Sequence, residues 1–251
     1  MFQTLAAFVI GAVLTTSPQQ VNDRIIIEGD TLEIDYPLPL GNNRAGYSLP
    51  DEIFTYFNCA RGYYCTWRIE KDSLLLVRID YCSDALQPEI LPNDINQFGS
   101  WVSQNIIIGY GEKIKYVDGG WLRTKEERIE IEKGLVVGNK IYDNSNTTLS
   151  PYTENTKHLT DFLRKNIDWK IVQLVPKKDL NYTSVFNLQV DKDGRIAEIH
   201  MKRSSNPVLE REALRVIRMV PQWSVYYKLG KMLNVDWMLP INFAKLMDGS
   251  K

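Results

Sequence analysis

The sequence predicts an α+β protein with two domains: a β-rich N-terminal domain, then a domain in which helices pack on a small antiparallel sheet. Three observations indicate this arrangement. Turn-forming residues interrupt residues 21–143 roughly every ten positions. A polar segment rich in Asn, Thr and Ser follows, and the last third alternates helix-like and strand-like apolar patterns. The 251 residues are 44% hydrophobic and 24% charged, a composition typical of folded proteins.

Charge is distributed unevenly along the chain. Residues 1–150 contain 13 Lys and Arg and 20 Asp and Glu, whereas residues 151–251 contain 17 and 11. This asymmetry predicts two units with different surroundings or partners, or two halves that attract each other. The positive excess of the second half is mild, and no run of Lys and Arg is interleaved with aromatic residues. We therefore expect no binding to nucleic acid.

The N-terminus carries a nearly continuous apolar run, Phe2–Leu14. The run is shorter than the roughly 20 residues that span a bilayer, and it fits the hydrophobic region of a signal peptide. We therefore expect residues 1–20 to be a signal peptide and the protein to lie in the periplasm or cell envelope. No Lys or Arg precedes the run, and Thr15–Pro18 is a poor cleavage site. A buried N-terminal strand or helix is the alternative.

Residues 21–143 form the predicted β-rich domain. Ile25–Ile27 and Leu32–Tyr36 flank Gly29-Asp30, which predicts a first hairpin. Tyr63–Ile69 and Leu74–Ile79 flank a polar turn and predict a second hairpin. Two further strands and one short helix are expected at Lys113–Val117, Arg128–Ile131 and Pro92–Ser103.

The three cysteines are too few for a disulfide framework. Cys59 could bridge to Cys65 in an oxidising compartment, or one of these two could pair with Cys82. The remaining thiol is then free, and we expect it to be buried. The spacing is wrong for zinc, and the chain has only two His. We expect no metal site and no cofactor.

Residues 144–157 are the predicted linker. Asp143–Asn155 consists almost entirely of polar turn formers and contains Pro151. Residues 158–245 are accordingly assigned to the second domain. This domain begins with an amphipathic helix that Asn155 or Thr156 can cap. Its apolar residues fall on one face: Leu159, Phe162, Leu163 and Ile167.

A hairpin and a second helix follow in this domain. Alternating apolar residues predict strands at Phe186–Val190 and Ala197–Met201, with a turn at Asp191–Gly194. Asn206 and Pro207 occupy the N-cap and first position of the helix, and the helix stops before Pro221. The apolar stripe of this helix is Leu209, Ala213, Val216, Ile217 and Val220.

The last predicted strand, Leu233–Phe243, has apolar residues at every second position. Pro240 removes a backbone donor, which predicts an edge strand or a bulge. Trp237 lies on the apolar face by alternation, and we expect it and Trp223 to be core residues. His158 and His200 have no partner set that indicates catalysis, and His200 should face solvent.

Four stretches of this domain, in this order, resemble the TonB C-terminal domain. They are Phe186–Ile196, Ser204–Leu209, Ala213–Trp223 and Leu239–Phe243. The sequence departs from the family in two places. Trp223 is followed by Ser224–Gly230 where the family usually has a Pro and a Gly, and Asp168-Trp169-Lys170 stands where many relatives have Tyr-Pro. In the first domain, Tyr64–Leu74 resembles a feature of uncharacterised bacterial envelope proteins.

The resemblance implies docking by β-augmentation, in which an extended partner segment adds to an exposed sheet edge. In the family, that partner is the periplasmic segment of an outer-membrane transporter, so membrane association would come only through partners. The candidate edge is the last strand. The candidate partner-binding residues are Asn234, Val235, Asp236, Met238 and Asn242. The alternatives are a strand that is simply buried or paired and a homodimer formed through it.

The expected function is protein interaction linked to TonB-dependent transmembrane transport. An energy-transducing TonB has a transmembrane helix and a long spacer rich in Pro, Lys and Glu, which this sequence does not show, so only docking is expected. No phosphate loop, paired-His metal motif or nucleophile elbow is present, and we expect no enzyme. The alternatives are a periplasmic ligand-binding or structural protein using the fold as a scaffold, and a regulator that competes for transporter segments.

Overall fold

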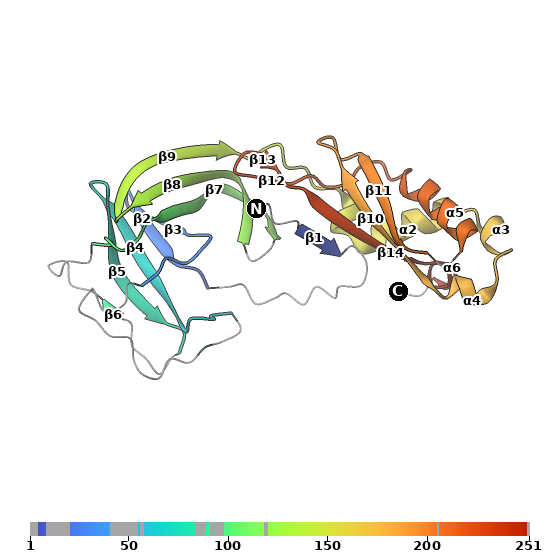
Figure 1. The fold of residues 1–251 in the computed structure, drawn as a ribbon, viewed down its shortest axis with the longest axis horizontal. Helices are drawn as coiled ribbons and strands as arrows, with labels where there is room; N and C mark the ends of the chain where they lie inside the picture. Colours follow the sequence, from blue (N-terminus) through green and yellow to red (C-terminus); the bar gives the residue numbers. More distant parts are fainter. Residues whose placement is uncertain are drawn as a thin grey trace. The chain divides into compact units, whose positions relative to one another are not determined.

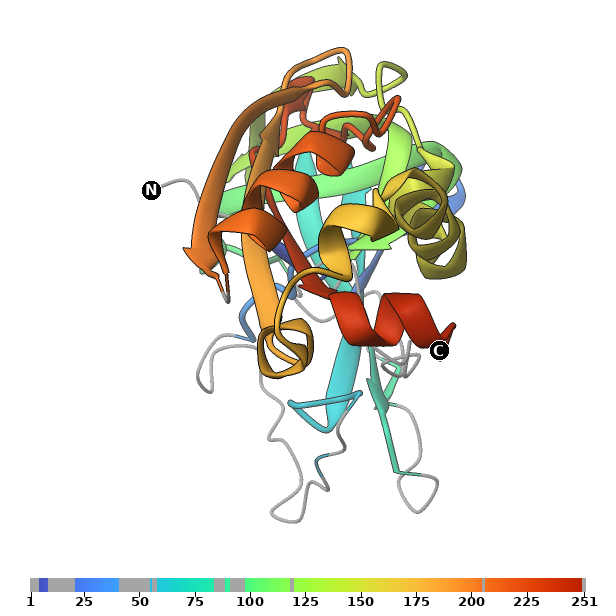
Figure 2. The same cartoon turned by 90° about the vertical axis from the view of Figure 1, so that its right-hand side faces the viewer.

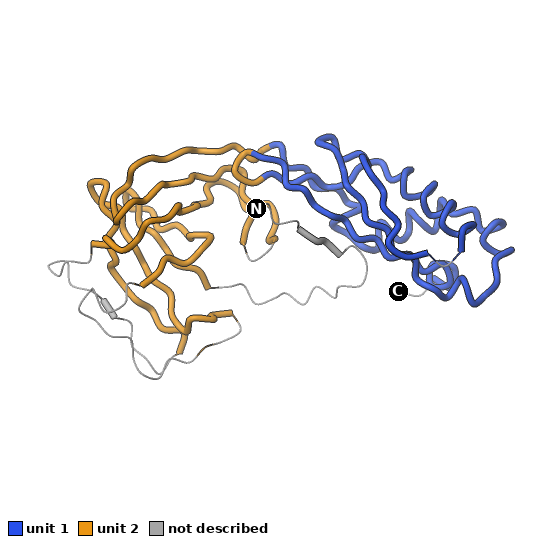
Figure 3. The backbone as a smooth tube through the Cα atoms, viewed as in Figure 1, with its two compact units in different colours: residues 1–15, 146–227, 231–251 blue, residues 16–145, 228–230 orange. Residues whose placement is uncertain are grey.

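The structure is a computed structural model and describes residues 5–8, 21–40, 55, 58–83, 89–90, 98–117, 120–204 and 206–249. The chain divides into two compact units (Figure 3). Unit 1 consists of residues 1–15, 146–227 and 231–251, and unit 2 consists of residues 16–145 and 228–230. In the described residues, unit 2 is built from strands and unit 1 from strands and helices (Figure 1). The protein is therefore α+β, as predicted.

In its described residues, unit 2 is an eight-stranded sheet with the order β3-β2-β4-β5-β9-β8-β7, in which β6 pairs with β5. Its strands are β2 (Arg24–Ile27), β3 (Asp30–Glu33), β4 (Tyr63–Glu70), β5 (Ser73–Tyr81), β6 (Glu89–Ile90), β7 (Gln104–Val117), β8 (Gly120–Glu132) and β9 (Leu135–Asp143). A bridge between Ile34 and Ile108 joins the region after β3 to β7. The two ends of the sheet therefore meet, and the sheet curls around its apolar face.

Both predicted hairpins of unit 2 are confirmed. β2 pairs antiparallel with β3, and β4 pairs antiparallel with β5. Lys71 and Asp72 join the second pair with φ angles of 49° and 61°. Two consecutive positive φ angles give a tight turn whose twist matches that of the strands. The core beneath these hairpins contains the fully buried Trp67, Leu76 and Ile108.

The rest of unit 2 departs from the prediction in two places. Strand β9 was not predicted. Two of its apolar side chains face away from the core, since Val137 and Ile141 are 53% and 66% exposed, so no pattern of buried apolar residues marks the strand. The short helix expected at Pro92–Ser103 is wrong in its described part. There Phe98 bridges to Leu75 and a turn follows, while residues 92–97 lie outside the described residues.

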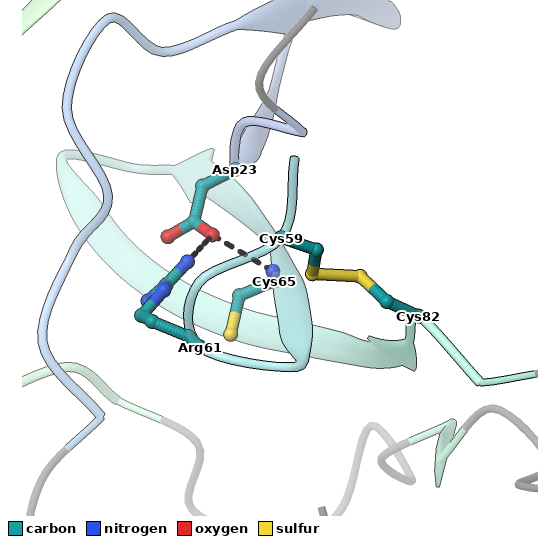
Figure 4. Close-up of a disulfide and its surroundings, with 5 residues drawn as sticks. All are labelled: Asp23, Cys59, Arg61, Cys65 and Cys82. Carbon is teal, nitrogen blue, oxygen red and sulfur yellow. Dashed lines mark hydrogen bonds and ion pairs between the residues drawn. A yellow bond between two sulfur atoms is a disulfide. The ribbon is translucent and has the colours of Figure 1, made fainter. Parts of the chain in front are cut away.

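Cys59 and Cys82 form the disulfide, and Cys65 is the free, buried thiol (Figure 4). This pairing is the second of the two left open by the sequence. The disulfide joins the segment before β4 to the segment after β5, so it fastens the open end of that hairpin. Burial raises the pKa of Cys65, which keeps this sulfur a neutral thiol in the core.

The described part of unit 1 contains a four-stranded sheet with the order β1-β14-β10-β11. Its strands are β1 (Leu5–Phe8), β10 (Thr183–Val190), β11 (Ile196–Arg203) and β14 (Val235–Asn242), with a separate small pair, β12 (Tyr227–Lys228) and β13 (Lys231–Met232). Its helices are α1 (Pro151–Glu154), α2 (Thr156–Asn166), α3 (Trp169–Val172), α4 (Lys177–Leu180), α5 (Pro207–Ile217) and α6 (Phe243–Asp248). Figure 2 shows α2 and α5 on one face of the sheet.

Helices α2 and α5 confirm the predicted helices and their caps. Asn155 accepts a hydrogen bond from the His158 N–H at 3.2 Å, and Asn206 accepts one from the Val208 N–H at 2.9 Å. Pro207 stands at the first position of α5, where its missing N–H costs nothing. All five residues of the predicted apolar stripe are buried, although α5 ends at Ile217 and Val220 lies beyond it.

The last strand is shorter than predicted. β14 ends at Asn242, whose side chain accepts a hydrogen bond from the Lys245 N–H at 3.0 Å and so caps α6. Phe243 therefore begins a helix, although it is buried as the alternation suggested. Leu233 also lies outside the strand.

Residues 144–157, which the sequence assigns to a linker, contain local structure, and the linker assignment stays a prediction. They contain α1, and Ser150 is buried. The Ser150 N–H donates to Ser224 Oγ at 2.8 Å, and its hydroxyl donates to the Gln222 carbonyl at 2.6 Å. Polar turn formers can bond through their own side chains and backbone, so this composition does not by itself mean an unpacked linker. The units divide between Ser145 and Asn146.

Of the predicted signal peptide, residues 1–20, the structure describes only Leu5–Phe8. These residues form β1, which agrees at four positions with the alternative of an N-terminal strand. The remaining residues of the segment lie outside the described residues, and the signal peptide stays a prediction.

Candidate docking edge

Strand β14 presents two different faces. Val235, Trp237, Leu239 and Ile241 are buried, while the residues between them are half-buried. This alternation places every second side chain in the core of unit 1. The opposite face carries Asp236, Met238, Pro240 and Asn242.

The two sides of β14 have different neighbours. On one side, Trp237–Asn242 pairs antiparallel with Thr183–Leu188 of β10. On the other side, Val235–Met238 pairs parallel with Leu5–Phe8 of β1. Among the described residues, Leu239–Asn242 has a strand neighbour only on the β10 side. Within the part of the chain that the structure describes, the outer side of β14 is therefore covered by the short parallel strand β1 over Val235–Met238 and has no strand beside it over Leu239–Asn242.

The first three predicted site residues lie at the start of the strand. Asn234 is exposed and precedes β14. Val235 begins the strand, and its side chain is only 5% exposed, so it belongs to the core and can offer a partner little besides its backbone. Asp236 lies on the half-buried face and accepts a hydrogen bond from Gln189 Nε2 at 3.0 Å.

The other two predicted site residues differ from each other. Met238 lies opposite Asn187 of β10 and Phe8 of β1. Asn242 is engaged inside unit 1: besides capping α6, its amide donates to the Asn181 carbonyl at 2.9 Å and to Thr183 Oγ1 at 3.2 Å. Its side chain therefore has a structural role. Of the five residues, Asp236 and Met238 share the half-buried face without belonging to the core or a cap.

An aromatic cluster supports β14 from the core side. The Trp237 ring lies 6.1 Å from the Trp223 ring and 5.8 Å from the Tyr226 ring, measured between centroids. Trp223 and Trp237 are both buried, as the sequence predicted. Burial and the hydrogen bond from its hydroxyl to Glu154 raise the pKa of Tyr226. These rings hold the strand in place and are not available to a partner.

The turn between β10 and β11 is bonded to the segment after α5. Gly194 has a φ of 73°, and its carbonyl accepts a hydrogen bond from the Trp223 N–H at 2.8 Å. A Cβ at this position would lie 2.4 Å from the Trp223 carbonyl oxygen. Only glycine allows both this backbone conformation and this close approach. Two of the stretches that carry the family resemblance thus meet here in space.

The histidines and acidic residues form no further site in the described part of the chain. His200 is exposed beside Glu198, at 3.0 Å, and His158 packs on the Tyr152 ring. The described ranges hold no group of three or more His, Cys, Asp or Glu placed to bind a metal. No helix within those ranges combines the length and apolarity needed to cross a membrane.

Unit 1 is thus a compact α+β module. Helices α2 and α5 cover one face of its small sheet (Figure 2), and β14 runs along an edge that is partly open in the described residues. Residues 177–244 of this chain match the family described as Gram-negative bacterial TonB protein C-terminal. The chain therefore carries a TonB C-terminal domain. The match begins at α4, so α2 and α3 belong to unit 1 but precede it. No curated protein and no solved structure matches the chain.

The departure from the family after Trp223 has a structural role that the sequence did not reveal. The residues there form the β12–β13 pair, and its turn, Lys228–Gly230, belongs to unit 2. In that unit the Leu229 N–H donates to Glu126 Oε2 at 2.6 Å, and the Gly230 N–H donates to Asn144 Oδ1 at 2.9 Å. In the sequence, the missing Pro and Gly after Trp223 indicated only that the loop differs from the family.

Proposed function

We propose that this chain is an exported, non-enzymatic interaction protein that docks the periplasmic segment of an outer-membrane transporter on the outer side of β14. A TonB C-terminal domain indicates a role in envelope transport or interactions. The observation that carries the proposal is the pairing of β14 on both sides: away from β10, its backbone accepts a parallel strand over Val235–Met238. Main-chain pairing of this kind is how an added strand binds.

Pro240 indicates which backbone groups of β14 face outward. A proline in a strand is tolerated where its missing N–H would point away from the neighbouring strand. Pro240 lies opposite Val185 of β10, so its nitrogen should point to the outer side. Backbone groups alternate along a strand, and the N–H groups of Asp236 and Met238 should therefore point outward as well. These two residues would supply the donors for a docked segment.

The predicted signal peptide is compatible with this role. The strand that pairs with β14, Leu5–Phe8, lies inside residues 1–20. Cleavage of that segment in the envelope would free the outer side of β14 along its whole length. A chain that retained the segment would hold it as a competitor for the same edge.

A capture experiment with a chain that begins at Val21, in which β1 does not cover the edge, tests the proposal. Met238→Pro removes one outward N–H, whereas Met238→Ala shortens the same side chain and keeps the N–H. Wild type and both variants are used as bait in envelope extract, and captured proteins are identified by mass spectrometry. We expect wild type and Met238→Ala to capture an outer-membrane transporter and Met238→Pro to lose it, with circular dichroism unchanged in all three.

Two outcomes would refute the proposal. One is capture of the transporter by Met238→Pro at the level of Met238→Ala, because the outward N–H would then be irrelevant. The other is failure of folded wild type to capture any outer-membrane transporter. Sedimentation of the wild type in the same buffer tests the alternative occupant, because a homodimer formed through β14 would be lost in Met238→Pro.

A further inference from the structure

Unit 2 contains a cavity of about 290 Å³ that the docking proposal does not use. Small-molecule sites usually measure about 300–1,000 Å³, so this cavity has room for a small metabolite and not for a folded partner. Its polar and aromatic lining consists of Asn22, Asp35, Tyr36, Arg61, Tyr63 and Lys228. All of these residues belong to unit 2, since the turn Lys228–Gly230 is part of it.

The two cations in this lining are held in place by carboxylates. Lys228 Nζ lies 2.7 Å from Asp35 Oδ2. Burial alone would lower the pKa of Lys228, but the charge of Asp35 and the hydrogen bond to it outweigh burial and raise that pKa. Lys228 therefore stays protonated at neutral pH.

Arg61 is anchored differently, by a carboxylate behind the cavity. Its guanidinium forms an ion pair with Asp23 (Figure 4). It also donates to the Leu38 carbonyl at 3.1 Å. Asp23 is fully buried and also accepts hydrogen bonds from the backbone N–H groups of Leu38 and Cys65, both at 2.9 Å. Trp67 Nε1 donates a further hydrogen bond to Asp23 at 3.3 Å. Of these four donors to the carboxylate, only Arg61 is charged.

Each cation also lies against a tyrosine ring. Arg61 Cζ is 4.7 Å from the Tyr63 centroid, and Lys228 Nζ is 5.8 Å from the Tyr36 centroid. Rings in this position attract the cation and shield it from water. The cavity therefore combines fixed positive charge with aromatic surface.

The charges of the lining select the ligand. Arg61 and Lys228 are both positive, and Asp35 is the one carboxylate among the lining residues. Asp23, the partner of Arg61, is fully buried and does not line the cavity, so a ligand there contacts two cations and one carboxylate. The lining therefore favours a ligand with one negative charge over a cation. The remaining surface, provided by the tyrosines and by apolar residues such as Pro37, suits a ring or a short aliphatic body. We propose that this cavity binds a small monocarboxylate with an apolar, preferably aromatic, body.

Three probes of one shape test the chemistry. Benzoate carries the expected negative charge, benzyl alcohol is neutral, and benzylamine is positive. Each is titrated into the full chain with the Cys59–Cys82 disulfide intact, and amide shifts are followed by nuclear magnetic resonance. We expect benzoate to give saturable shifts at Ala60 and Gly120, which line the cavity. Benzyl alcohol should bind on the order of tenfold more weakly, and benzylamine should give no saturable shift.

A matched pair of lysine variants tests the location. Lys228→Gln removes a cation from the cavity. Lys140→Gln removes a lysine of the same unit that also lies over a tyrosine, 5.1 Å from the Tyr142 centroid, but does not line the cavity. We expect Lys228→Gln to weaken benzoate binding on the order of tenfold and Lys140→Gln to leave it unchanged.

Three results would overturn the inference. They are the absence of saturable shifts with benzoate in the folded wild type, equal binding of benzoate and benzylamine, and equal weakening by the two lysine variants. Tyr36→Leu covers the case in which Lys228→Gln disturbs the fold, because the Tyr36 side chain is largely exposed. A folded Tyr36→Leu chain should bind benzoate more weakly, and unchanged binding would count against the site. None of these results depends on whether β14 docks a transporter.

Discussion

At the scale of single residues, buried charges explain several local structures. Glu212 of α5 is 5% exposed, yet it is fully engaged. One of its oxygens accepts from the Asp168 N–H at 2.7 Å, and Arg215 donates to both oxygens. The same arginine donates to the Asn166 carbonyl at 2.6 Å. This group joins α5 to the end of α2 and the start of α3, where free backbone groups need partners.

Glu212→Gln should therefore destabilise the protein, by about 1–3 kcal/mol. The amide loses the ion pair with Arg215 and matches the donors around it poorly. Urea unfolding measures the effect. The control is Glu198→Gln, because Glu198 is an exposed carboxylate beside His200, where an ion pair contributes little. A loss of stability no larger than that of the control would contradict this role for Glu212.

The loss of stability caused by Glu212→Gln should depend on pH. The hydrogen bond from Arg215 lowers the pKa of Glu212 below its ordinary value of 4.5. A carboxylate with a lowered pKa stabilises the folded state above its unfolded pKa, and this stabilisation disappears as pH falls through the folded pKa. The stability difference between wild type and Glu212→Gln should thus be constant near neutral pH and shrink below pH 4.5.

At the scale of elements, local patterns predicted helices better than strand neighbours. The caps and stripes of α2 and α5 are encoded within about a dozen consecutive residues. For β14, alternation predicted which side chains are buried, and Pro240 indicated an edge. The pattern carried no information on what lies beyond that edge, because strand pairing depends on residues far away in the sequence. The pairing of β14 with Leu5–Phe8 joins opposite ends of the chain.

Removal of residues 1–20 tests that pairing directly. The outward amides of Asp236 and Met238 should exchange with solvent faster in a chain that begins at Val21 than in the full chain, because β1 no longer covers them. The Leu239 amide should keep its protection, since by alternation it points to β10. Hydrogen exchange read by nuclear magnetic resonance measures all three. Unchanged exchange at Asp236 and Met238 would show that β1 does not protect them in solution.

At the scale of the whole molecule, the boundary between the units follows three-dimensional contacts and not sequence order. The chain leaves unit 1 twice, for residues 16–145 and again for Lys228–Gly230, and returns each time. Within unit 2, this turn bonds to Asp35, Glu126 and Asn144. Glu126 is 1% exposed, and a buried carboxylate that loses its donors is costly. The turn is therefore part of the packing of unit 2.

A fragment of residues 146–251 should consequently fail to hold the turn Lys228–Gly230 in its native conformation. It keeps the TonB C-terminal match but lacks the acceptors of the turn, so the Leu229 and Gly230 amides should lose hydrogen-exchange protection relative to the full chain. The Trp223 amide, whose acceptor is the Gly194 carbonyl inside the fragment, should stay protected. Equal protection of the turn in fragment and full chain would mean that unit 2 does not hold it.

The sequence by itself determined the features that depend on a few consecutive residues. Period-two and helical patterns identified the hairpins, the two long helices and the buried face of β14, since burial of one face requires that spacing. Asn206, Pro207 and Gly194 marked backbone positions that few other residues can occupy. The family resemblance rested on the same landmarks, and the match at residues 177–244 confirms it.

Only the tertiary structure decided which distant residues meet. It selected Cys82 as the partner of Cys59, added β9, assigned Asn242 to a helix cap, and brought Lys228 beside Asp35. Each of these contacts joins positions whose local sequence is compatible with several partners. The choice among them depends on the free energy of the whole packed unit, which must exceed the entropy lost in closing each loop, and no local pattern carries that information.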